Sequence, residues 1–420
     1  MLIAEVRVIY ADGTEAVYGT DDTWQVTRSR FVFSNIYDGE ILDDTLPPVA
    51  PVPATLLKEL PAGELTARYS PRVIIHTELK PKLMYTPAGE TVFDLGQNMA
   101  GGFRYKVCLP KGETLKLTFG EQLQKGCFYR DNLRSAKAEY IYVSDGRPHV
   151  LENQFTFYGG RYVKVEGIKN PDPEDFRGLC YTTQMDRTGY LETGHPLVQQ
   201  LLSNVEWSRL DNFIDVPTDC PQRDERMGWT GDAEVFAPTA CYQADTYAFY
   251  RKYLHDRYTE QQMLGGMVPN VIPRFDLEGP STVWGDAATV IPTVVYNFTG
   301  DITILEEQYD SMKAWVDYIT RTDGDDANWR KVFHFGDWLA LDKVKLDPAD
   351  PLGATDNGFI ADTYYRYSSQ MVSEAAKLLG KEEDAAVYAD LAEQIKARIL
   401  EEYFTSTERC AVNTQTALLL

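Results

Sequence analysis

The sequence contains few cysteines and histidines, and neither type is spaced to build a disulfide framework or to hold a metal ion. Six cysteines are scattered over 420 residues with no CxxC pair, which predicts free thiols in a reducing compartment. The five histidines show neither HxxxH nor HExxH spacing. The sequence therefore indicates no metal and no other cofactor, and we expect a cytoplasmic location.

Positive charge and long apolar runs are also scarce. Lysine and arginine total 41 against 63 acidic residues, a net charge of −22, which argues against a nucleic-acid or anionic-membrane partner. No stretch approaches the length of a transmembrane helix. The N-terminal residues alternate apolar and polar around an Asp12-Gly13 turn, and Glu5 and Arg7 interrupt the apolar run. They predict a β-hairpin and not a signal peptide, so we expect a soluble protein.

The first half of the chain has the period of β-strands. We interpret residues 1–69 as the end of an N-terminal β-domain with a proline-rich linker, and residues 70–183 as a β-sandwich. Turn signals such as Lys111-Gly112 and Asp145-Gly146 separate the short alternating runs of this region. The predicted strands are 72–76, 103–108, 115–119, 138–143 and 162–166.

The second half has the period of helices. The expected helices are 195–213, 233–262 with a break near Pro238, 286–298, 304–320, 359–379 and 382–403, with another starting at 412–420. Helices in pairs, with loops rich in Gly, Pro, Trp and Asp between them, favour an (α/α)6 toroid for residues 184–420. An α-solenoid is the alternative, but the sequence shows no fixed repeat length.

The segment Asp215–Asp232 carries five carboxylates, two arginines and a tryptophan within eighteen residues. Pro221 and Gly228 would disrupt a helix interior, so the segment is expected to form a fixed loop. Any single acid here is equally well explained as a helix cap or a structural ion pair. The cluster as a whole predicts a sugar-cleaving site, because glycoside hydrolysis needs two carboxyl groups with different proton affinities.

Two later segments repeat this mixture of residues. Ser281–Asp286 places Trp284 next to an acid before a helix, and His334–Leu339 contains Asp337 and Trp338. Each tryptophan taken alone fits a hydrophobic core better than a ligand wall. Three such loops beside helix boundaries favour one pocket for a small hydroxylated ring, which offers an apolar face and hydroxyl groups.

The segment TDCPQRDERMGWTGD (218–232) resembles the signature of bacterial α-L-rhamnosidases, glycoside hydrolase family 78. The stretches 92–101, 132–134 and 157–162 are also similar to that family, so the resemblance covers essentially the whole chain. It implies an (α/α)6 barrel that removes terminal L-rhamnose from an oligosaccharide or glycoside with inversion at the anomeric carbon. It also implies that Glu225 is the general acid. The implied substrate-binding residues are Asp219, Arg223, Trp229, Asp232, Trp284, Asp337 and Trp338.

One part of the family pattern has no counterpart. The family's general base is a glutamate from a late barrel loop, followed by a histidine, and no segment here matches that loop. We therefore expect a fragment, with its toroid incomplete at the C-terminal end and little or no activity of its own. The alternatives are another (α/α)6 glycosidase and a non-catalytic carbohydrate-binding protein. The sequence leaves the aglycone and the oligomeric state open.

Overall fold

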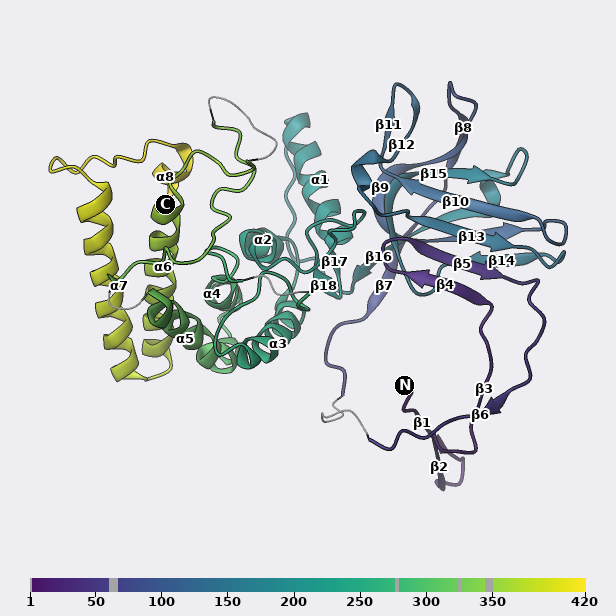
Figure 1. The fold of residues 1–420 in the computed structure, drawn as a ribbon, viewed down its shortest axis with the longest axis horizontal. Coiled ribbons are helices and arrows are strands. Elements are labelled where there is room, and N and C mark those ends of the chain that lie inside the picture. The colour runs from purple at the N-terminus through teal and green to yellow at the C-terminus, as the bar shows by residue number, and fades with distance from the viewer. Residues whose placement is uncertain (1, 60–66, 276–278, 324–325, 344–349) are drawn as a thin grey trace. The chain divides into compact units, whose positions relative to one another are not determined.

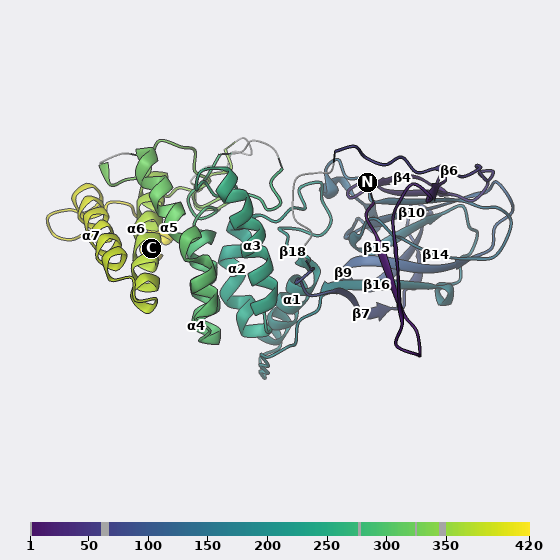
Figure 2. The same cartoon turned by 90° about the horizontal axis from the view of Figure 1, so that it is seen from below.

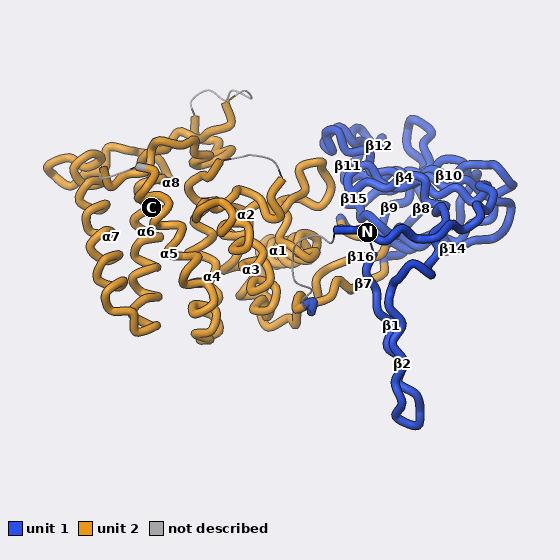
Figure 3. The backbone as a smooth tube through the Cα atoms, turned by 60° about the horizontal axis from the view of Figure 1, so that its bottom comes forward, with its two compact units in different colours: residues 1–68, 79–98, 102–178 blue, residues 69–78, 99–101, 179–420 orange. Residues whose placement is uncertain are grey.

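The computed structural model describes residues 2–59, 67–275, 279–323, 326–343 and 350–420. These residues form a β-rich part and a helical part (Figure 1). The chain divides into two compact units (Figure 3). Unit 1 comprises residues 1–68, 79–98 and 102–178, and unit 2 comprises residues 69–78, 99–101 and 179–420. The predicted fold class, a β-rich region followed in the chain by an all-α region, is confirmed.

The chain begins with the predicted hairpin. Strand β1 (Glu5–Ile9) pairs antiparallel with β2 (Glu15–Gly19), and the Tyr10 N–H donates to the Thr14 carbonyl across the turn at 2.9 Å. Gly13 has a φ of +84°, a conformation that glycine adopts without the steric cost of a Cβ atom. Two further short pairs are β3 (Gln25–Val26) with β6 (Val52–Pro53), and β11 (Gln122–Gln124) with β12 (Cys127–Tyr129).

The main sheet has the strand order β4-β5-β13-β10-β15-β9-β16-β7, with β8 and β14 also pairing with β9. Strands β5 and β13 run parallel, and Asp43 lies opposite Val143 at their carboxyl ends. The five strand runs predicted after residue 70 all fall within or overlap strands of this sheet. The strands are β4 (Phe31–Asn35), β5 (Gly39–Asp43), β7 (Val73–Leu79), β8 (Lys82–Tyr85), β9 (Thr91–Val107), β10 (Thr114–Gly120), β13 (Glu139–Val143), β14 (His149–Glu152), β15 (Tyr158–Glu166) and β16 (Phe176–Thr183).

Aromatic side chains fill the core of unit 1. Phe103 stacks on Phe176 at 5.9 Å between ring centroids, and Phe93 and Tyr105 both contact Phe176. All four side chains are buried. Burial of such large rings is a major source of folding free energy. Aromatic packing thus accounts for much of the core of the sheet region.

The helices of unit 2 pack as neighbours: α4 contacts α2 and α5, and α6 contacts α5 and α7 (Figure 2). Their ends carry the expected signals, since Pro196 opens α1, Asp356 caps α6 by accepting from the Phe359 N–H, and Gly300 ends α4 with a left-handed φ of +69°. The buried core includes Trp315 and Trp329. No helix in the described part of the chain is long and apolar enough to cross a membrane. The helices are α1 (Pro196–Asn212), α2 (Thr230–Gln243), α3 (Tyr247–Met263), α4 (Ala287–Thr299), α5 (Thr303–Asp323), α6 (Asn357–Leu378), α7 (Glu382–Tyr403) and α8 (Gln415–Leu419).

The break expected near Pro238 was wrongly placed. Pro238 lies inside α2, and the helical run is interrupted later, between Gln243 and Tyr247. There the Gln243 carbonyl accepts from the N–H groups of Thr188 and Gly189. Backbone N–H groups of the segment before α1 therefore bind the carbonyl of the last residue of α2. The interruption is set by tertiary hydrogen bonding and not by proline.

Candidate active site

The segment between Asp215 and Asp232 forms a loop closed by its own hydrogen bonds. The Asp219 N–H donates to the Met227 carbonyl, and the Met227 N–H donates to Asp219 Oδ1, both at 3.2 Å. Inside this closure, Arg226 Nη1 donates to the Pro221 carbonyl at 2.8 Å. The prediction of a fixed, non-helical loop is confirmed for residues 215–229, while residues 230–232 begin α2. Its residues carry their side chains on a backbone whose polar groups are largely satisfied within the loop.

The end of the loop is anchored to the segment 270–272. The Ile272 N–H donates to the Gly228 carbonyl at 2.9 Å, and the Thr230 N–H donates to the Asn270 carbonyl at 2.8 Å. A Cβ atom on Gly228 would lie 2.1 Å from the Ile272 carbonyl oxygen, so only glycine allows this approach. Helix α2 begins directly afterwards and carries Asp232 in its first turn.

Two of the predicted carboxylates share one guanidinium. Arg223 Nη2 lies 3.4 Å from Glu225 Oε2 and 3.8 Å from Asp219 Oδ2. The Asp219 side chain is 8% exposed and that of Glu225 is 30% exposed, so Glu225 is the more accessible of these two carboxylates. The Trp229 indole N–H donates to the Glu225 backbone carbonyl at 3.3 Å, which holds the backbone at the residue predicted to be the acid.

Burial and like charge change the proton affinity of the other two acids. The pKa of Asp232 is raised to about 6, first by burial and then by the charges of Asp219 and Glu225, while Arg223 opposes the rise. The pKa of Asp219 is also raised, first by burial, against the hydrogen bond from the Met227 N–H. Two acids with raised pKa values therefore lie in one loop and helix start.

A cavity of about 220 Å³ reaches two of these acids. It is lined by Asp219 and Asp232 together with residues of α1, β17 (Phe213–Ile214), β18 (Val216–Pro217) and α2. This volume lies below the range of about 300–1,000 Å³ typical of drug-sized pockets. It suits a small molecule that uses carboxylate acceptors on one side.

The three predicted tryptophan loops meet at Phe335. The ring centroid of Phe335 lies 4.5 Å from that of Trp284, 5.3 Å from that of Trp338 and 6.3 Å from that of Trp229. Trp284 also packs over Gly231, where a Cβ atom would lie 2.7 Å from the indole ring. The expected convergence of aromatic loops is present. Phe335 was not singled out from the sequence, although it stands inside the His334–Leu339 segment.

Polar contacts hold the second and third loops together. The Thr282 N–H donates to His334 Nδ1 at 3.0 Å, and the Phe335 N–H donates to Ser281 Oγ at 3.0 Å. His334 Nε2 lies 2.8 Å from the Trp329 carbonyl, so it carries the ring proton. Burial lowers the pKa of His334 to about 4, and the imidazole stays neutral as a structural link.

The other acids of these loops are engaged elsewhere. The Asp337 carboxylate accepts from the Thr355 N–H at 3.3 Å and lies against the backbone of Gly353. Asp286 is fully buried and accepts from the Trp315 indole N–H at 2.9 Å and the Ser368 hydroxyl at 2.6 Å. Neither carboxylate is bonded to the 219–232 acids in the described contacts. The structure thus brings Trp338 to the aromatic cluster, while Asp337 braces its own loop.

Two more residues of the first loop have structural roles. Asp215 has a φ of +65° and binds Lys252 Nζ through its carboxylate at 3.0 Å. Cys220 is buried, which raises the pKa of its thiol to about 12 and leaves it unreactive. All six cysteines are free thiols, as predicted.

Comparisons with family models match three regions of the chain. Residues 186–420, more than half of its length, match the bacterial α-L-rhamnosidase six-hairpin glycosidase domain. Residues 84–181 match the concanavalin-like domain of bacterial α-L-rhamnosidases, and residues 1–50 match an α-L-rhamnosidase N-terminal domain. The six-hairpin match agrees with the toroid predicted from the helical pattern.

Individual relatives agree with the family models. An α-L-rhamnosidase of Formosa agariphila is 34% identical over the whole of this chain, which covers 46% of that protein. One from Alteromonas sp. is 33% identical, with 47% of its length covered. The chain therefore spans about half the length of these relatives.

Solved structures of α-L-rhamnosidases superpose on nearly the whole chain. The enzyme of Aspergillus terreus gives a TM-score of 0.90 at 32% identity, with 99% of this chain and 50% of that one covered. The Streptomyces avermitilis enzyme, solved with L-rhamnose, gives 0.89 at 32% identity, with 99% and 40% covered. The chain belongs to the bacterial α-L-rhamnosidase family.

Proposed function

We propose that the protein containing this chain hydrolyses terminal α-L-rhamnose from glycosides, with Glu225 as the general acid. The observation that carries the proposal is the placement of Glu225. Its side chain is the more exposed of the two carboxylates beside Arg223, and the Trp229 indole N–H holds its backbone carbonyl. A partly exposed carboxyl on a fixed backbone can reach the oxygen of a glycosidic bond and protonate it.

The remaining residues of the cluster suit a sugar. Asp219 and Asp232 line the cavity and can accept hydrogen bonds from hydroxyl groups. Arg223 can donate to ring hydroxyls through its planar guanidinium. The Trp284 indole N–H is buried and has no hydrogen-bond partner among the described residues. It could donate to a bound hydroxyl, while Trp229, Trp338 and Phe335 supply the apolar wall.

We further propose that hydrolysis inverts the anomeric centre. Inversion requires a second carboxylate about 6.5–9.5 Å from the acid, with the attacking water between them. We assign only the acid to this chain. The assays below therefore use the complete reading frame that encodes it.

Glu225→Gln tests the assignment. We expect kcat/KM to fall about 10²–10⁴-fold, the usual contribution of a general acid. The loss should be greater for alkyl rhamnosides than for nitrophenyl rhamnosides, because a nitrophenolate leaves without being protonated. Proton NMR of the first sugar released should show the β-anomer.

Asp215→Asn is the matched control, because Asp215 lies in the same loop and binds Lys252. It should retain near-normal turnover. Undiminished turnover of alkyl rhamnosides by Glu225→Gln would refute the role of Glu225. A preference for another sugar in a panel of nitrophenyl glycosides would refute the substrate, and rhamnose binding without any turnover would indicate a carbohydrate-binding protein.

A further inference from the structure

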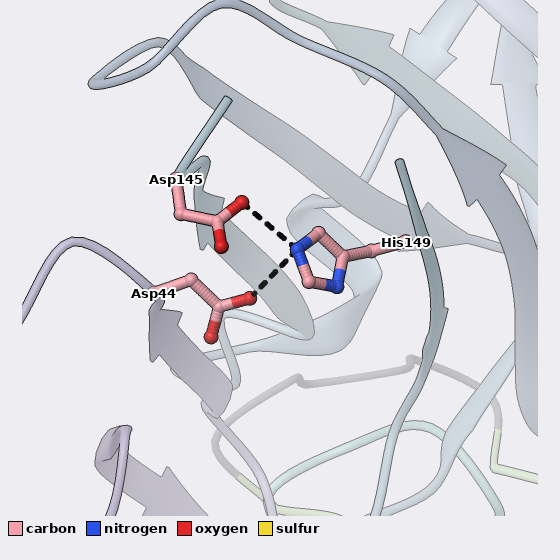
Figure 4. Close-up of side chains that lie close together, drawn as sticks. All are labelled: Asp44, Asp145 and His149. Carbon is pink, nitrogen blue, oxygen red and sulfur yellow. Dashed lines mark hydrogen bonds and ion pairs between the residues drawn. The ribbon is translucent and has the colours of Figure 1, made fainter. Parts of the chain in front are cut away.

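Unit 1 contains a group of potential metal ligands outside the candidate active site. Asp44 follows β5, Asp145 lies in the turn after β13, and His149 begins β14 (Figure 4). Because β5 and β13 are parallel and Asp43 lies opposite Val143, the two strands end at the same edge of the sheet. The sheet topology thus brings together residues that are far apart in the sequence.

The ligand atoms of the three side chains face one another. His149 Nε2 lies 2.9 Å from Asp145 Oδ1 and 3.6 Å from Asp44 Oδ2, and the three atoms all lie within 4.8 Å of each other. The side chains of Asp44, Asp145 and His149 are only 2%, 9% and 24% exposed. Metal–ligand distances to nitrogen and oxygen are about 2.0–2.2 Å. Movements of about 1 Å or less in these side chains would therefore let the imidazole nitrogen and the two carboxylate oxygens bind one ion.

In each aspartate, the carboxylate oxygen that does not face His149 binds an arginine. Arg30 Nη1 binds Asp44 Oδ1 at 2.6 Å, and Arg147 Nε binds Asp145 Oδ2 at 2.7 Å. The oxygens that remain are those that face the imidazole. Outer partners of this kind commonly orient the ligands of protein metal sites.

Tyr142 provides an independent indication of a ligand. Its side chain is fully buried, and its hydroxyl lies beside the Asp44 carboxylate and the Ser144 side chain without a hydrogen bond of ordinary geometry to either. Its ring centroid lies 6.0 Å from that of His149. Burial raises the pKa of Tyr142, and the charges of Asp44 and Asp145 add to the rise, which places the hydroxyl beside both carboxylates. Buried hydroxyls normally have a partner, often a bound water.

We propose that Asp44, Asp145 and His149 bind one divalent transition-metal ion such as Zn²⁺, and that the Tyr142 hydroxyl hydrogen-bonds a water on that ion. An imidazole nitrogen with two carboxylate oxygens favours zinc over Ca²⁺ or Mg²⁺, which prefer all-oxygen sites. Binding replaces the Nε2–H···O contact with a metal–Nε2 bond: in a neutral ring the proton moves from Nε2 to Nδ1, and a protonated ring releases its Nε2 proton to solvent. The ion would join the ends of β5, β13 and β14.

Titration of the purified 420-residue chain with Zn²⁺ and Co²⁺ tests this site. Isothermal calorimetry should detect one Zn²⁺ per chain, and Co²⁺ should give visible bands without the near-ultraviolet charge transfer of a thiolate ligand. The spectrum is needed because the chain has six free thiols. A thiolate band, or no zinc binding at micromolar concentration, would overturn the proposal.

Variants separate this site from other zinc binding. His149→Ala and Asp145→Asn should each abolish the stoichiometric zinc, while His195→Ala, at an exposed histidine, should bind like wild type. Tyr142→Phe removes only the hydroxyl and should weaken binding about tenfold. Circular dichroism checks that each variant is folded. If folded His149→Ala and Asp145→Asn bind zinc as wild type does, the assignment is wrong.

Discussion

The two acid clusters of this protein differ in how their negative charge is balanced. In unit 2, Asp219, Glu225 and Asp232 are grouped around Arg223, and the pKa of Asp232 is raised to about 6 by burial and by the other two acids. In unit 1, Asp44 and Asp145 each bind an arginine. Hydrogen bonds from Arg147 and His149 hold the pKa of Asp145 well below its usual range.

The difference indicates what each cluster can do. Acids that share too little positive charge can have raised pKa values, as Asp219 and Asp232 do, which suits hydrogen bonding to sugar hydroxyls and proton transfer. Acids that are individually paired stay ionised, so their free oxygens remain available as metal ligands. Residue type alone does not separate the two cases, because both clusters combine aspartate with arginine. The number of cations per acid does.

Arg223→Met should have the largest effect on this comparison, because it removes the guanidinium shared by Asp219 and Glu225. We expect kcat/KM of the complete protein on rhamnosides to fall about 10²–10³-fold, as for the loss of one key donor in an active site. The pKa of Asp232 should rise further, since Arg223 opposes its increase. The pH dependence of kcat/KM measures both effects.

Arg223→Lys is the control for that experiment. It keeps the charge and loses the planar fork, so it should preserve the pH profile better than the methionine variant does. Equal pH profiles for Met, Lys and wild type would show that Arg223 does not set the proton affinities of the cluster.

Asp232→Asn should have the next largest effect, on stability. A carboxyl whose pKa rises from 3.8 to about 6 on folding destabilises the folded state at neutral pH; because Asp232 is exposed to solvent, screening keeps this cost below the ~3 kcal/mol that the same shift would represent for a fully buried group. The folded state binds the proton more tightly, so this cost is absent below about pH 4 and grows as the pH rises through 6. Urea unfolding followed by tryptophan fluorescence should therefore show that the free energy of unfolding of the variant increases relative to that of wild type between pH 4 and pH 7. A difference that stays constant with pH would contradict the raised pKa.

Arg147→Met should have the smallest effect of the three. Arg147 lies at the protein surface, and solvent screens exposed ion pairs. We expect the pKa of Asp145 to move up toward its ordinary value, with little change in the urea midpoint at pH 7. Carboxyl NMR of labelled aspartate gives the titration, and Arg7→Met, which removes another exposed pair, serves as the reference. An unchanged pKa of Asp145 would show that Arg147 does not balance this cluster.

Local features of the fold and of the site were predictable from the sequence. Five of the eight predicted site residues, from Asp219 to Asp232, lie in one short segment, so their proximity needs no long-range contact. Pro221 and Gly228 exclude a regular helix there on local steric grounds. The hairpin at Asp12-Gly13 and the helix that ends at Tyr403 follow equally from local patterns.

Long-range features were not predictable in the same way. Phe335 became the meeting point of three tryptophans because His334 and Ser281 join two loops that are about fifty residues apart. The sequence likewise did not predict that the Asp337 carboxylate contacts the backbone of Gly353 and Thr355, and its place in the pocket stays a prediction. These outcomes depend on contacts between segments that are distant in the chain, and neither segment's sequence indicates which other segment it will contact.

The sequence by itself determined the order of a strand-rich and a helical region, the rigid acidic loop and the resemblance to the rhamnosidase family. Each of these depends on residues close together in the chain. Only the tertiary structure decided which acids share a cation, which face an indole or a backbone, and that Asp44, Asp145 and His149 meet at one sheet edge. The physical reason is that burial and charge pairing set the pKa and the partners of a carboxylate. Both arise only when distant segments pack together.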